Sequence, residues 1–502
     1  MVPPGSAEAA KTLSPAKKLS YKVPPWQHQA VAIERAAPAD HFAFLFEVGT
    51  GKSAAAIHTL RHKYVAAGRV MRTLILTPAI TLENWRREWF VHSEVRHTAI
   101  DVLTGTGVER ELSVLEHMKS REPANILITN YETLLMPKVL EALMAWGPEI
   151  LLCDEAHRLK NIEAKRTKAA IKIADKADVR LLLTGTPILN SPLDLFAQWR
   201  ILDRGETFGQ NLYAFRAEYF WDRNAGMPRQ TYFPDWIPKT SCYARLRAKI
   251  EHCSMSVKKV DCLDLPPLVK RELPIALAPE QRRLYNEMKR DFIAFVKRSD
   301  GRELGVAVAT LALTKALRLM EICSGFVTTE GEDGGPRKKR TLTDNPRAAA
   351  LKELLEDLGA EHKIIVWAVF KENYQTIRDV CDAVGLPYVE VHGDVSAKRK
   401  QEAVDTFNND PRCRVFLGHP RSGGIGINLV ASDISIVYSR TFSLEDDVQA
   451  EARNYRGGSE IHAKVTRIDL IAAGTIDEEI ALRLRMKQAV GAKVLCGMVD
   501  SI

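Results

Sequence analysis

Short, continuously apolar runs separated by longer amphipathic stretches make up the chain from about residue 24 to about residue 203. The runs are residues 42–46, 73–77, 125–129, 150–153 and 180–184. Continuous runs of this length are typical of strands buried on both faces, and strands that alternate with helices form parallel sheets. The pattern therefore predicts an α/β lobe with a mostly parallel sheet between two layers of helices.

The same pattern returns in the last third of the chain, where the apolar runs are residues 363–367, 388–392, 414–417 and 434–438. Between them, helical patterns and aromatic-rich loops occupy residues 205 to 345. We expect two tandem α/β lobes with a helical insertion between them. The predicted boundaries are a flexible arm at 1–22, a first lobe at 23–264 with an insertion from about 205, a helical linker at 265–345, a second lobe at 346–487 and a tail at 488–502.

A glycine-rich segment follows the first apolar run directly, and it consists of Glu47, Val48, Gly49, Thr50, Gly51, Lys52 and Ser53. Glycines let the backbone curl until several N–H groups point at phosphate oxygens. Lys52 adds a positive charge for the β- and γ-phosphates, and Ser53 supplies a hydroxyl for Mg²⁺. Phe46 stands where the general pattern has glycine. The segment predicts an ATP-binding loop, and the alternative is an ordinary strand-to-helix turn.

Two carboxylates, Asp154 and Glu155, come directly after the apolar run 150–153. The carboxyl ends of parallel strands are where open α/β sheets bind ligands. Asp154 is placed to hold Mg²⁺, usually through water, and Glu155 to orient and deprotonate an attacking water. The structural alternative is an acidic helix N-terminus stabilised by the helix dipole.

The second lobe has two candidate phosphate-binding features. The turn 423–429 contains Gly424 and Gly426, which bring backbone N–H groups close to a phosphate or only reverse the chain. Arg453 and Arg456 lie three residues apart, on one face of a predicted helix. They could reach across a cleft and neutralise a γ-phosphate, as an arginine finger does, or belong to a solvated basic face.

Composition narrows the class of protein. The 502 residues are 46% hydrophobic and 27% charged, which predicts an ordered chain, and the net charge of +8 suits a polyanionic partner. No apolar stretch reaches the roughly 20 residues of a transmembrane helix. We expect a soluble, cytoplasmic protein. The eight cysteines are scattered, so reduced thiols are expected. One zinc set is conceivable but fits no familiar spacing, namely Cys242, His252, Cys253 and Cys262.

With these elements in order, the chain resembles the Swi/Snf-type ATPases of helicase superfamily two. The resemblance extends from about residue 24 to about residue 487. Its motifs follow the family's order at residues 25–29 (Q-motif), 47–53 (I), 76–78 with 84–88 (Ia), 129–132 (Ib), 154–157 (II), 184–187 (III), 423–429 (V) and 449–456 (VI). Pro420, Phe442 with Ser443, and Ser459 depart from the usual pattern, yet none of them removes a catalytic group.

The resemblance implies further roles. It implies two RecA-like lobes, the use of ATP and Mg²⁺, and tracking along duplex or forked DNA. It implies that Gln27 reads the adenine edge with Trp26 beside the base, and that Gln449 belongs to the nucleotide site. Contacts with a nucleic-acid strand are implied for Thr77, Pro78, Asn84, Thr129, Asn130, Tyr131 and Asn428. Coupling between the nucleotide and nucleic-acid sites is implied for Thr184, Gly185 and Thr186.

The expected protein is an ATP-driven DNA translocase with little sequence specificity, of a compact bacterial or phage type. A strand-separating or annealing helicase on DNA or RNA is the alternative, and a catalytically silent DNA-binding scaffold is a weaker one. The only candidate wedge for separating strands is the aromatic segment 232–236, which ordinary packing also explains. No protein partner is identified, and a monomer fits the sequence. The protein is expected near the nucleoid of a bacterial or phage-infected cell.

Overall fold

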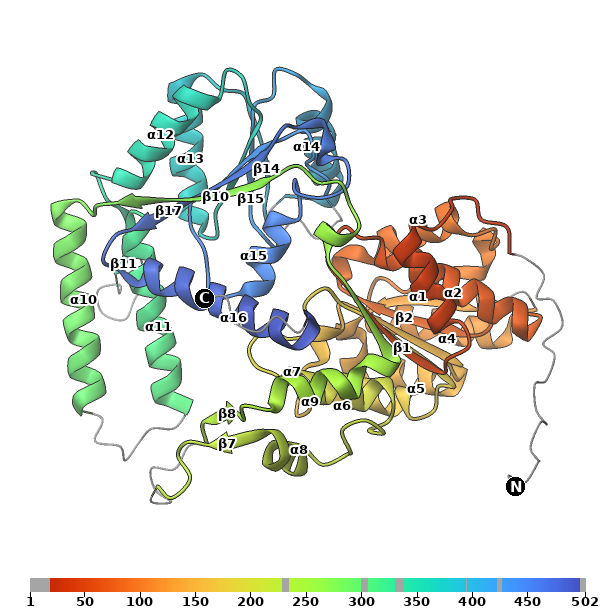
Figure 1. Cartoon of the computed structure of the whole chain (residues 1–502). Coiled ribbons are helices and arrows are strands. Elements are labelled where there is room, and N and C mark those ends of the chain that lie inside the picture. The colour runs from red at the N-terminus through yellow and green to blue at the C-terminus, as the bar shows by residue number, and fades with distance from the viewer. Residues whose placement is uncertain are drawn as a thin grey trace, which may run out of the picture.

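Two α/β lobes lie side by side, with a long helical hairpin projecting from the second (Figure 1). The computed structural model describes residues 19–121, 123–227, 234–298, 306–329, 338–393, 395–421 and 427–496. The predicted N-terminal arm lies almost wholly outside the described residues. Among the described residues, no helix is long and apolar enough to cross a bilayer.

The first lobe contains a seven-stranded sheet in which every pairing is parallel. The predicted strands are all present, and β3 and β9 are added at the two edges. From edge to edge the strands are β3 (Ile100–Val102), β4 (Ile126–Asn130), β2 (Thr73–Thr77), β5 (Ile150–Asp154), β6 (Val179–Leu183), β1 (His41–Phe46) and β9 (Ser254–Val257).

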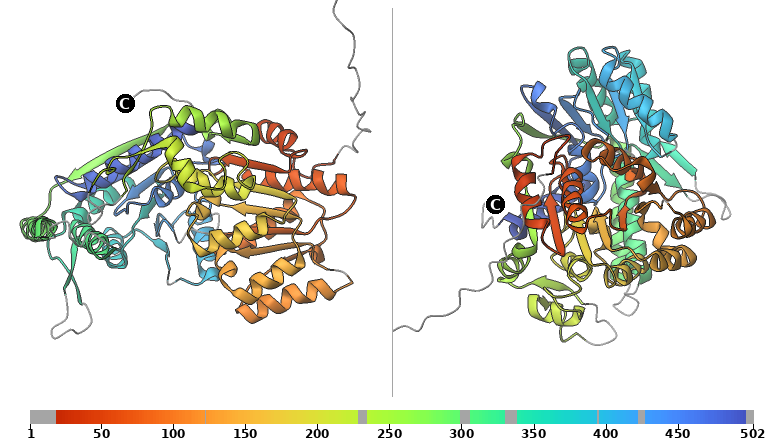
Figure 2. Two further views of the ribbon diagram at one scale, coloured as in Figure 1. Left: turned by 90° about the horizontal axis from the view of Figure 1, so that it is seen from below. Right: turned by 90° about the vertical axis from the view of Figure 1, so that its right-hand side faces the viewer.

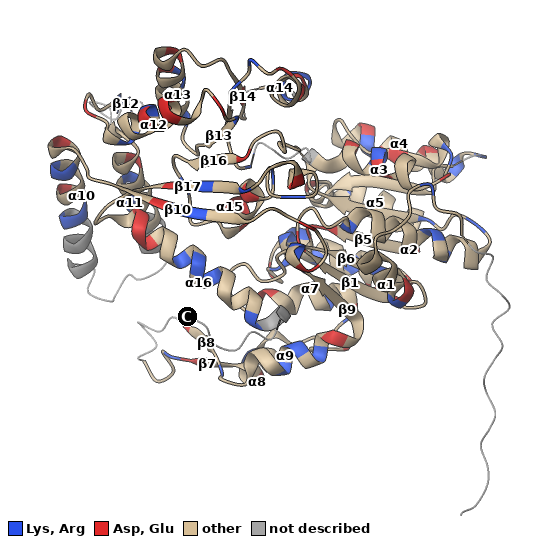
Figure 3. Cartoon of the chain, turned by 45° about the horizontal axis from the view of Figure 1, so that its top comes forward, with Lys and Arg blue, Asp and Glu red and all other residues tan. Residues whose placement is uncertain are grey.

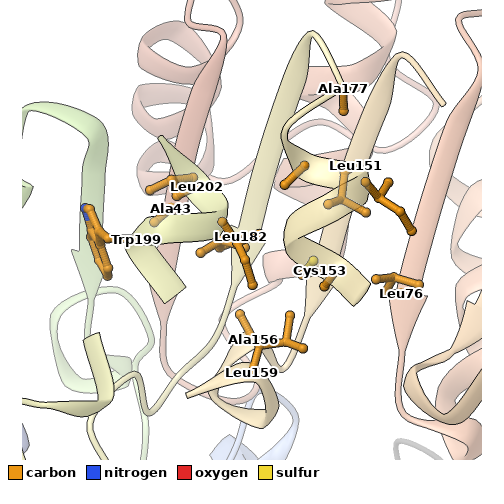
Figure 4. Close-up of a cluster of buried hydrophobic side chains, with 14 of the residues drawn as sticks. Ala43, Leu76, Leu151, Cys153, Ala156, Leu159, Ala177, Leu182, Trp199 and Leu202 are labelled. Carbon is orange, nitrogen blue, oxygen red and sulfur yellow. The ribbon is translucent and has the colours of Figure 1, made fainter. Parts of the chain in front are cut away.

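Alternate side chains of each apolar run enter two separate cores, one on each face of this sheet. Leu74 and Leu76 of β2 enter one core, whereas Ile75 enters the other. Figure 4 shows the first of these cores, where strand residues meet Trp199 and Leu202 of a covering helix. One face is covered by α1 (Gln27–Ala36), α2 (Lys52–Ala67) and α3 (Leu82–His92), and the other by α4 (Gly107–Lys119), α5 (Pro137–Trp146), α6 (Lys165–Ala174) and α7 (Asp194–Leu202).

An excursion of the first lobe follows α7 and contains α8 (Leu212–Tyr219), the hairpin β7 (Phe220–Asp222) and β8 (Trp236–Pro238), and α9 (Cys242–Ile250). Of the predicted wedge, Tyr232 and Phe233 lie outside the described residues. The half-buried Trp236 packs against the core of the first lobe, and the guanidinium of Arg216 lies 5.3 Å from its ring centroid. This contact agrees with the alternative in which the aromatic segment packs on the protein and does not act as a wedge.

The second lobe contains a six-stranded, fully parallel sheet. Its strands are β10 (Leu268–Ile275), β17 (Val465–Ala472), β16 (Ile434–Val437), β13 (Ile364–Trp367), β15 (Val415–Gly418) and β14 (Tyr388–Val391). The helices α12 (Pro346–Leu358) and α13 (Lys371–Val384) pack on one face, and α14 (Ala397–Asn409) and α15 (Leu444–Glu451) pack on the other. Two parallel sheets flanked by helices confirm the predicted fold class.

The boundary between the linker and the second lobe differs from the predicted one. Residues 265–345 are predicted to be a helical linker, but β10 lies in this range and pairs along its whole length with β17. As an edge strand it carries charged side chains outward, and so lacks the apolar run used to predict strands. The hairpin of α10 (Pro279–Arg298) and α11 (Val306–Cys323), followed by β11 (Phe326–Thr329) and β12 (Lys338–Thr341), is then an insertion within the second lobe.

The last helix, α16 (Ile476–Cys496), begins in the second lobe and ends against the first (Figure 1, Figure 2). Ile480 and Leu484 share an apolar cluster with Leu189 of the first lobe. Farther along, Val490 packs on the core of the first lobe. The predicted tail from residue 488 is therefore helical as far as residue 496 and bridges the two lobes.

Charged residues of both signs are spread over both lobes, including α10 and α16 (Figure 3). On β12, Lys339 pairs with Glu372 at 2.6 Å and Arg340 pairs with Glu280 at 3.0 Å.

Candidate active site

The glycine-rich loop joins the carboxyl end of β1 to the first turn of α2. Gly49 and Gly51 have φ angles of +92° and +75°, which L side chains rarely adopt. A Cβ on Gly51 would lie 2.0 Å from Nε2 of Gln29, so the loop also lacks space for one. Phe46 needs no such freedom, since it is the buried last residue of β1 and has no positive φ. The departure from the general pattern therefore leaves the loop intact.

Two side chains of helix α1 contact the backbone of this loop. The Nε2 atom of His28 lies 2.9 Å from the carbonyl oxygen of Thr50, and Gln29 donates from its Nε2 to the carbonyl oxygens of Thr50 and Gly51 at 3.4 and 3.3 Å. Trp26 lines the adjacent cavity, whereas Gln27 is exposed and does not line it. Gln29 thus braces the loop, and adenine recognition by Gln27 stays a prediction. A glutamine at the third position of a helix is a capping signal that points to Gln29.

A cavity of about 580 Å³ lies between the lobes, above the phosphate loop. Its size is in the range of small-molecule sites, roughly 300 to 1,000 Å³. The predicted residues that line it are Trp26, Val48, Gly49, Gly51, Lys52, Ser53, Pro78, Asn84, Asp154, Glu155, Gln449, Arg453 and Arg456. The fully buried Thr50 instead donates its hydroxyl to the carbonyl oxygen of Glu47 at 2.8 Å, and Glu47 lines a second cavity behind the loop.

Asp154 ends β5 at the floor of the cavity and is 7% exposed. Its Oδ2 accepts from the Thr77 hydroxyl at 2.9 Å and from the Trp85 indole nitrogen at 2.8 Å. Burial raises the pKa of Asp154, and the neighbouring Glu155 charge raises it further, while Trp85, Lys52 and Thr77 oppose these effects. The carboxylate is thus oriented by fixed donors, and a cation beside it would offset the cost of its burial.

His157 connects three parts of the site. Its Nδ1 lies 3.1 Å from the hydroxyl of Thr184 and 3.4 Å from Oε2 of Glu155, and its Nε2 lies 3.2 Å from Oε1 of Glu445 in the second lobe. Burial alone would raise the pKa of Glu445, but the hydrogen bond and charge of His157, together with Arg158 and Arg421, lower it to about 2. Glu445 is therefore ionised, and it joins the carboxylate motif to α15.

The two arginines enter the cavity from the second lobe. A Cβ on Gly49 would lie 3.2 Å from Cβ of Arg456, so this arginine packs directly against the phosphate loop. Burial lowers the pKa of Arg453 to about 10, the charge of Arg456 lowers it too, and Glu155 opposes both. Nε of Arg453 is buried and has no hydrogen-bond partner among the described residues. A phosphate group in the cavity would accept a hydrogen bond from this nitrogen and reduce the repulsion between the two guanidinium groups.

Lys259, which follows β9, is absent from the residues predicted from the sequence. Its backbone N–H donates to Oε2 of Glu47 at 2.9 Å, and its Nζ donates to the carbonyl oxygen of Tyr455 at 3.1 Å, beside the arginines. Burial lowers the pKa of Lys259 to about 8, Arg456 and Lys52 lower it too, and Glu451 and Glu47 oppose them. The residues around Lys259 form no known phosphate-binding pattern, so the sequence alone does not indicate that this lysine lies near the cavity.

Comparison with known proteins identifies the family. The SNF2-related domain matches residues 44–325, more than half of the chain, and the helicase conserved C-terminal domain matches residues 346–458. The chain belongs to the SNF2-related family. This confirms the family expected from the order of the motifs.

Three similar proteins show how far the likeness extends. An uncharacterized ATP-dependent helicase of Mycoplasma genitalium is 28% identical over 454 residues, covering 89% of this chain and 40% of the relative. The ISWI chromatin-remodeling complex ATPase ISW2 of Saccharomyces cerevisiae is 25% identical, covering 88% of this chain and 38% of the relative. The chain thus spans two fifths or less of the length of these relatives. The SWI2/SNF2 ATPase core of Sulfolobus solfataricus, solved in complex with dsDNA, is 20% identical with a TM-score of 0.42, covering 95% of this chain and 94% of that one.

The strand-contacting residues expected from the SNF2 motifs are mostly directed inward. Thr77, Thr129 and Tyr131 are fully buried, and the Tyr131 hydroxyl donates to the carbonyl oxygen of Asp154 at 2.5 Å. Asn130 accepts from Nη1 of Arg110 at 2.8 Å. These side chains therefore support the loops from inside, and contact of the same segments with a nucleic-acid strand stays a prediction that would rest on their backbone. Buried polar residues at the ends of strands give the same sequence pattern as exposed ones.

The remaining predicted residues occupy different environments. Pro78 and Asn84 line the nucleotide cavity, and Asn428 is exposed at the surface of the second lobe. A Cβ on Gly185 would lie 2.9 Å from the carbonyl oxygen of Phe46, so the coupling segment of Thr184, Gly185 and Thr186 packs on the base of the phosphate loop. Gly424 and Gly426 lie outside the described residues.

Proposed function

We propose that this protein is a motor that hydrolyses ATP and moves along duplex or forked DNA with little sequence specificity. The observation that carries the proposal is the shared cavity, in which Arg453 and Arg456 of the second lobe face Lys52 of the first. Because no single lobe holds all these groups, hydrolysis requires the lobes to be together. Cycles of joining and separation can then be converted into movement along a strand.

The residues around the cavity suit the chemistry of phosphoryl transfer. Lys52 and the N–H groups of the loop hold the phosphates, and Ser53 and Asp154 would hold Mg²⁺. The cation would neutralise phosphate charge. Glu155 orients the attacking water and accepts its proton. Arg453 and Arg456 stabilise the charge on the transferred group.

DNA as the track is supported by family membership and by relatives named as chromatin-remodeling ATPases. The net charge of +8 is compatible with this partner. Contacts should be mainly to phosphates, so binding should weaken steeply with salt and depend little on sequence. We further place the protein in the cytoplasm of a bacterial or phage-infected cell, as a monomer.

The proposal is tested by measuring ATP turnover without polymer and with single-stranded DNA, duplex DNA, forked DNA and RNA. Duplex or forked DNA should stimulate turnover most. The Glu155→Gln variant should bind ATP yet lose about a hundred- to a thousandfold in rate, since the general base is gone. Equal turnover with and without every polymer, or a Glu155→Gln variant at the parent rate, would refute the motor.

Strand separation is the competing activity, and a triplex assay distinguishes it. A translocase should displace a third strand from a triplex while plain duplexes stay paired. Because Trp236 packs on the first lobe, the Trp236→Ala variant should behave like the parent in this assay. ATP-dependent separation of tailed duplexes that is lost in Trp236→Ala, with hydrolysis kept, would replace translocation by helicase activity.

A further inference from the structure

A second group of chemically active side chains lies at the amino end of β1, the end opposite to the phosphate loop. It consists of His41, His252 and Cys253, whose ligand atoms all lie within 4.8 Å of one another. His41 is the first residue of β1, and the other two belong to the short helix η5 (Glu251–Cys253) that leads into β9. Within the described chain, neither imidazole has another hydrogen-bond partner.

The strand register explains why these residues meet. β1 and β9 are parallel neighbours with Ala43 opposite Ser254. His41 begins β1 two residues before Ala43, His252 lies in η5 two residues before Ser254, and their ring centroids are 6.4 Å apart. Cys253 lies in a helical turn rather than in the strand, so its side chain does not follow the alternation that would send it to the other face.

We propose that His41, His252 and Cys253 bind one zinc ion, with water as the fourth ligand. Zinc prefers imidazole nitrogen and thiolate sulfur in a tetrahedron, with bonds of about 2.0 to 2.3 Å that place ligand atoms about 3.5 Å apart. The observed separations, all within 4.8 Å, exceed that value by no more than about 1.3 Å. His252 is exposed and lies in a short turn outside the sheet, so its side chain is the member of the set with room to move.

The surroundings of the sulfur provide an independent argument. Nε1 of Trp199 and Oγ1 of Thr207 are buried and have no hydrogen-bond partner in the described part of the chain. Both side chains approach the sulfur, whose thiol donates to the carbonyl oxygen of Ile250 at 3.6 Å. A zinc-bound thiolate would accept from both donors. Metal-bound cysteines and histidines commonly have such partners in their second coordination sphere.

Nearby carboxylates favour a cation at the same place. The carboxylates of Asp203 and Glu206 lie near His41, as does the guanidinium of Arg180, so the charges next to the imidazole sum to one negative charge. Asp203 accepts from the backbone N–H groups of residues 205–207 and is fixed in position. The negative charge beside the histidines would reduce the cost of bringing a divalent ion to a partly buried site.

This set differs from the one that the cysteine spacing suggested. Neither Cys242 nor Cys262 belongs to the group of ligand atoms that lie within 4.8 Å of one another. Only His252 and Cys253 of that set reach the cluster. A metal there would fasten the end of the excursion that contains α8 and α9 to the first strand of the lobe.

The test is a titration of the full, tag-free chain with Co²⁺ in excess Mg²⁺, followed by competition with Zn²⁺. One cobalt per chain should produce a thiolate-to-cobalt charge-transfer band, which zinc abolishes. Cys253→Ser should lose this band, and His252→Gln should weaken zinc binding by at least about tenfold. The exposed position of His252 keeps this second variant informative if Cys253→Ser does not fold.

Two matched variants serve as controls. His97→Gln removes an exposed imidazole elsewhere, and Cys262→Ser removes a thiol outside the cluster, so both should bind zinc like the parent. A cobalt spectrum without a thiolate band would mean adventitious binding to surface histidines. The absence of a thiolate band would overturn the proposal. A band that persists in Cys253→Ser, or unchanged zinc affinity in His252→Gln, would overturn it too.

Discussion

Lys259 should make contact between the lobes depend on pH. Burial in the interlobe contact lowers its pKa from 10.5 to about 8. Separating the lobes would return the ammonium to water and to its ordinary pKa. Between pH 8 and 10.5 the separated state then binds a proton that the joined state does not, so raising the pH favours joining. At neutral pH the buried charge costs about 3 kcal/mol, at roughly 1.4 kcal/mol for each pH unit of the difference.

The Lys259→Met variant removes the titrating group while keeping the apolar stem. In the parent, the ratio of joined to separated molecules should rise about tenfold between pH 7 and pH 9. In Lys259→Met the ratio should be nearly constant over this range. Lys258→Met is the matched control, because Lys258 is the half-buried neighbour whose side chain should leave the response unchanged.

Energy transfer between dyes on the two lobes reports the ratio directly. Dyes on Glu34→Cys and Glu353→Cys would stand at exposed positions of the first and second lobes. Of the native cysteines, Cys262 is half-buried and six others are buried, namely Cys153, Cys242, Cys253, Cys323, Cys381 and Cys413. Identical pH responses in the parent and in Lys259→Met would refute the link between this lysine and lobe contact.

Three other predictions concern the cavity. Arg456→Ala should lower kcat by about a thousandfold or more while ATP affinity stays within about tenfold, because such an arginine acts in the transition state; steady-state kinetics and nucleotide binding separate the two. The ionised carboxylate of Glu445 should stabilise the fold above about pH 4.5 and lose that contribution as the pH falls towards 2, because its pKa is lowered in the folded state; acid unfolding of the parent and of Glu445→Gln would show the difference. Trp85→Phe removes a donor to Asp154, so half-maximal hydrolysis should need about tenfold more Mg²⁺, and an unchanged Mg²⁺ requirement would contradict the role of that hydrogen bond.

The strands of both sheets follow from apolar runs because parallel strands are buried on both faces. β10 could not be found in this way, since it lies at an edge and exposes charged residues such as Lys270 and Glu272. β9 shows the same limit, with the polar Ser254 and Ser256 in its short span. Burial on two faces leaves a pattern in the sequence, whereas pairing at an edge is decided by backbone hydrogen bonds.

Groups that touch phosphate could be predicted because the chemistry fixes their type and spacing, as in the loop that contains Lys52. Supporting groups could not. Gln29 and Trp85 act through distances set by the fold, and the pairing of His41 with His252 depends on the register of two strands far apart in sequence. Threonine and tyrosine occur both at protein surfaces and in interiors. Thr77 and Tyr131 are buried because the fold covers them, which their residue types alone do not reveal.

Helix α16 gives the two lobes a second connection. The chain joins them once through the segment after β9, and α16 joins them again through Leu484 and Val490. Two attachment points leave far fewer relative orientations than one, so the lobes meet at a high effective concentration and lose little entropy on closing. Relative motion is then closer to rotation about a fixed line than to free diffusion on a tether. Loosening α16, for example with Val490→Ser, would act on every step of a cycle without touching a reacting group.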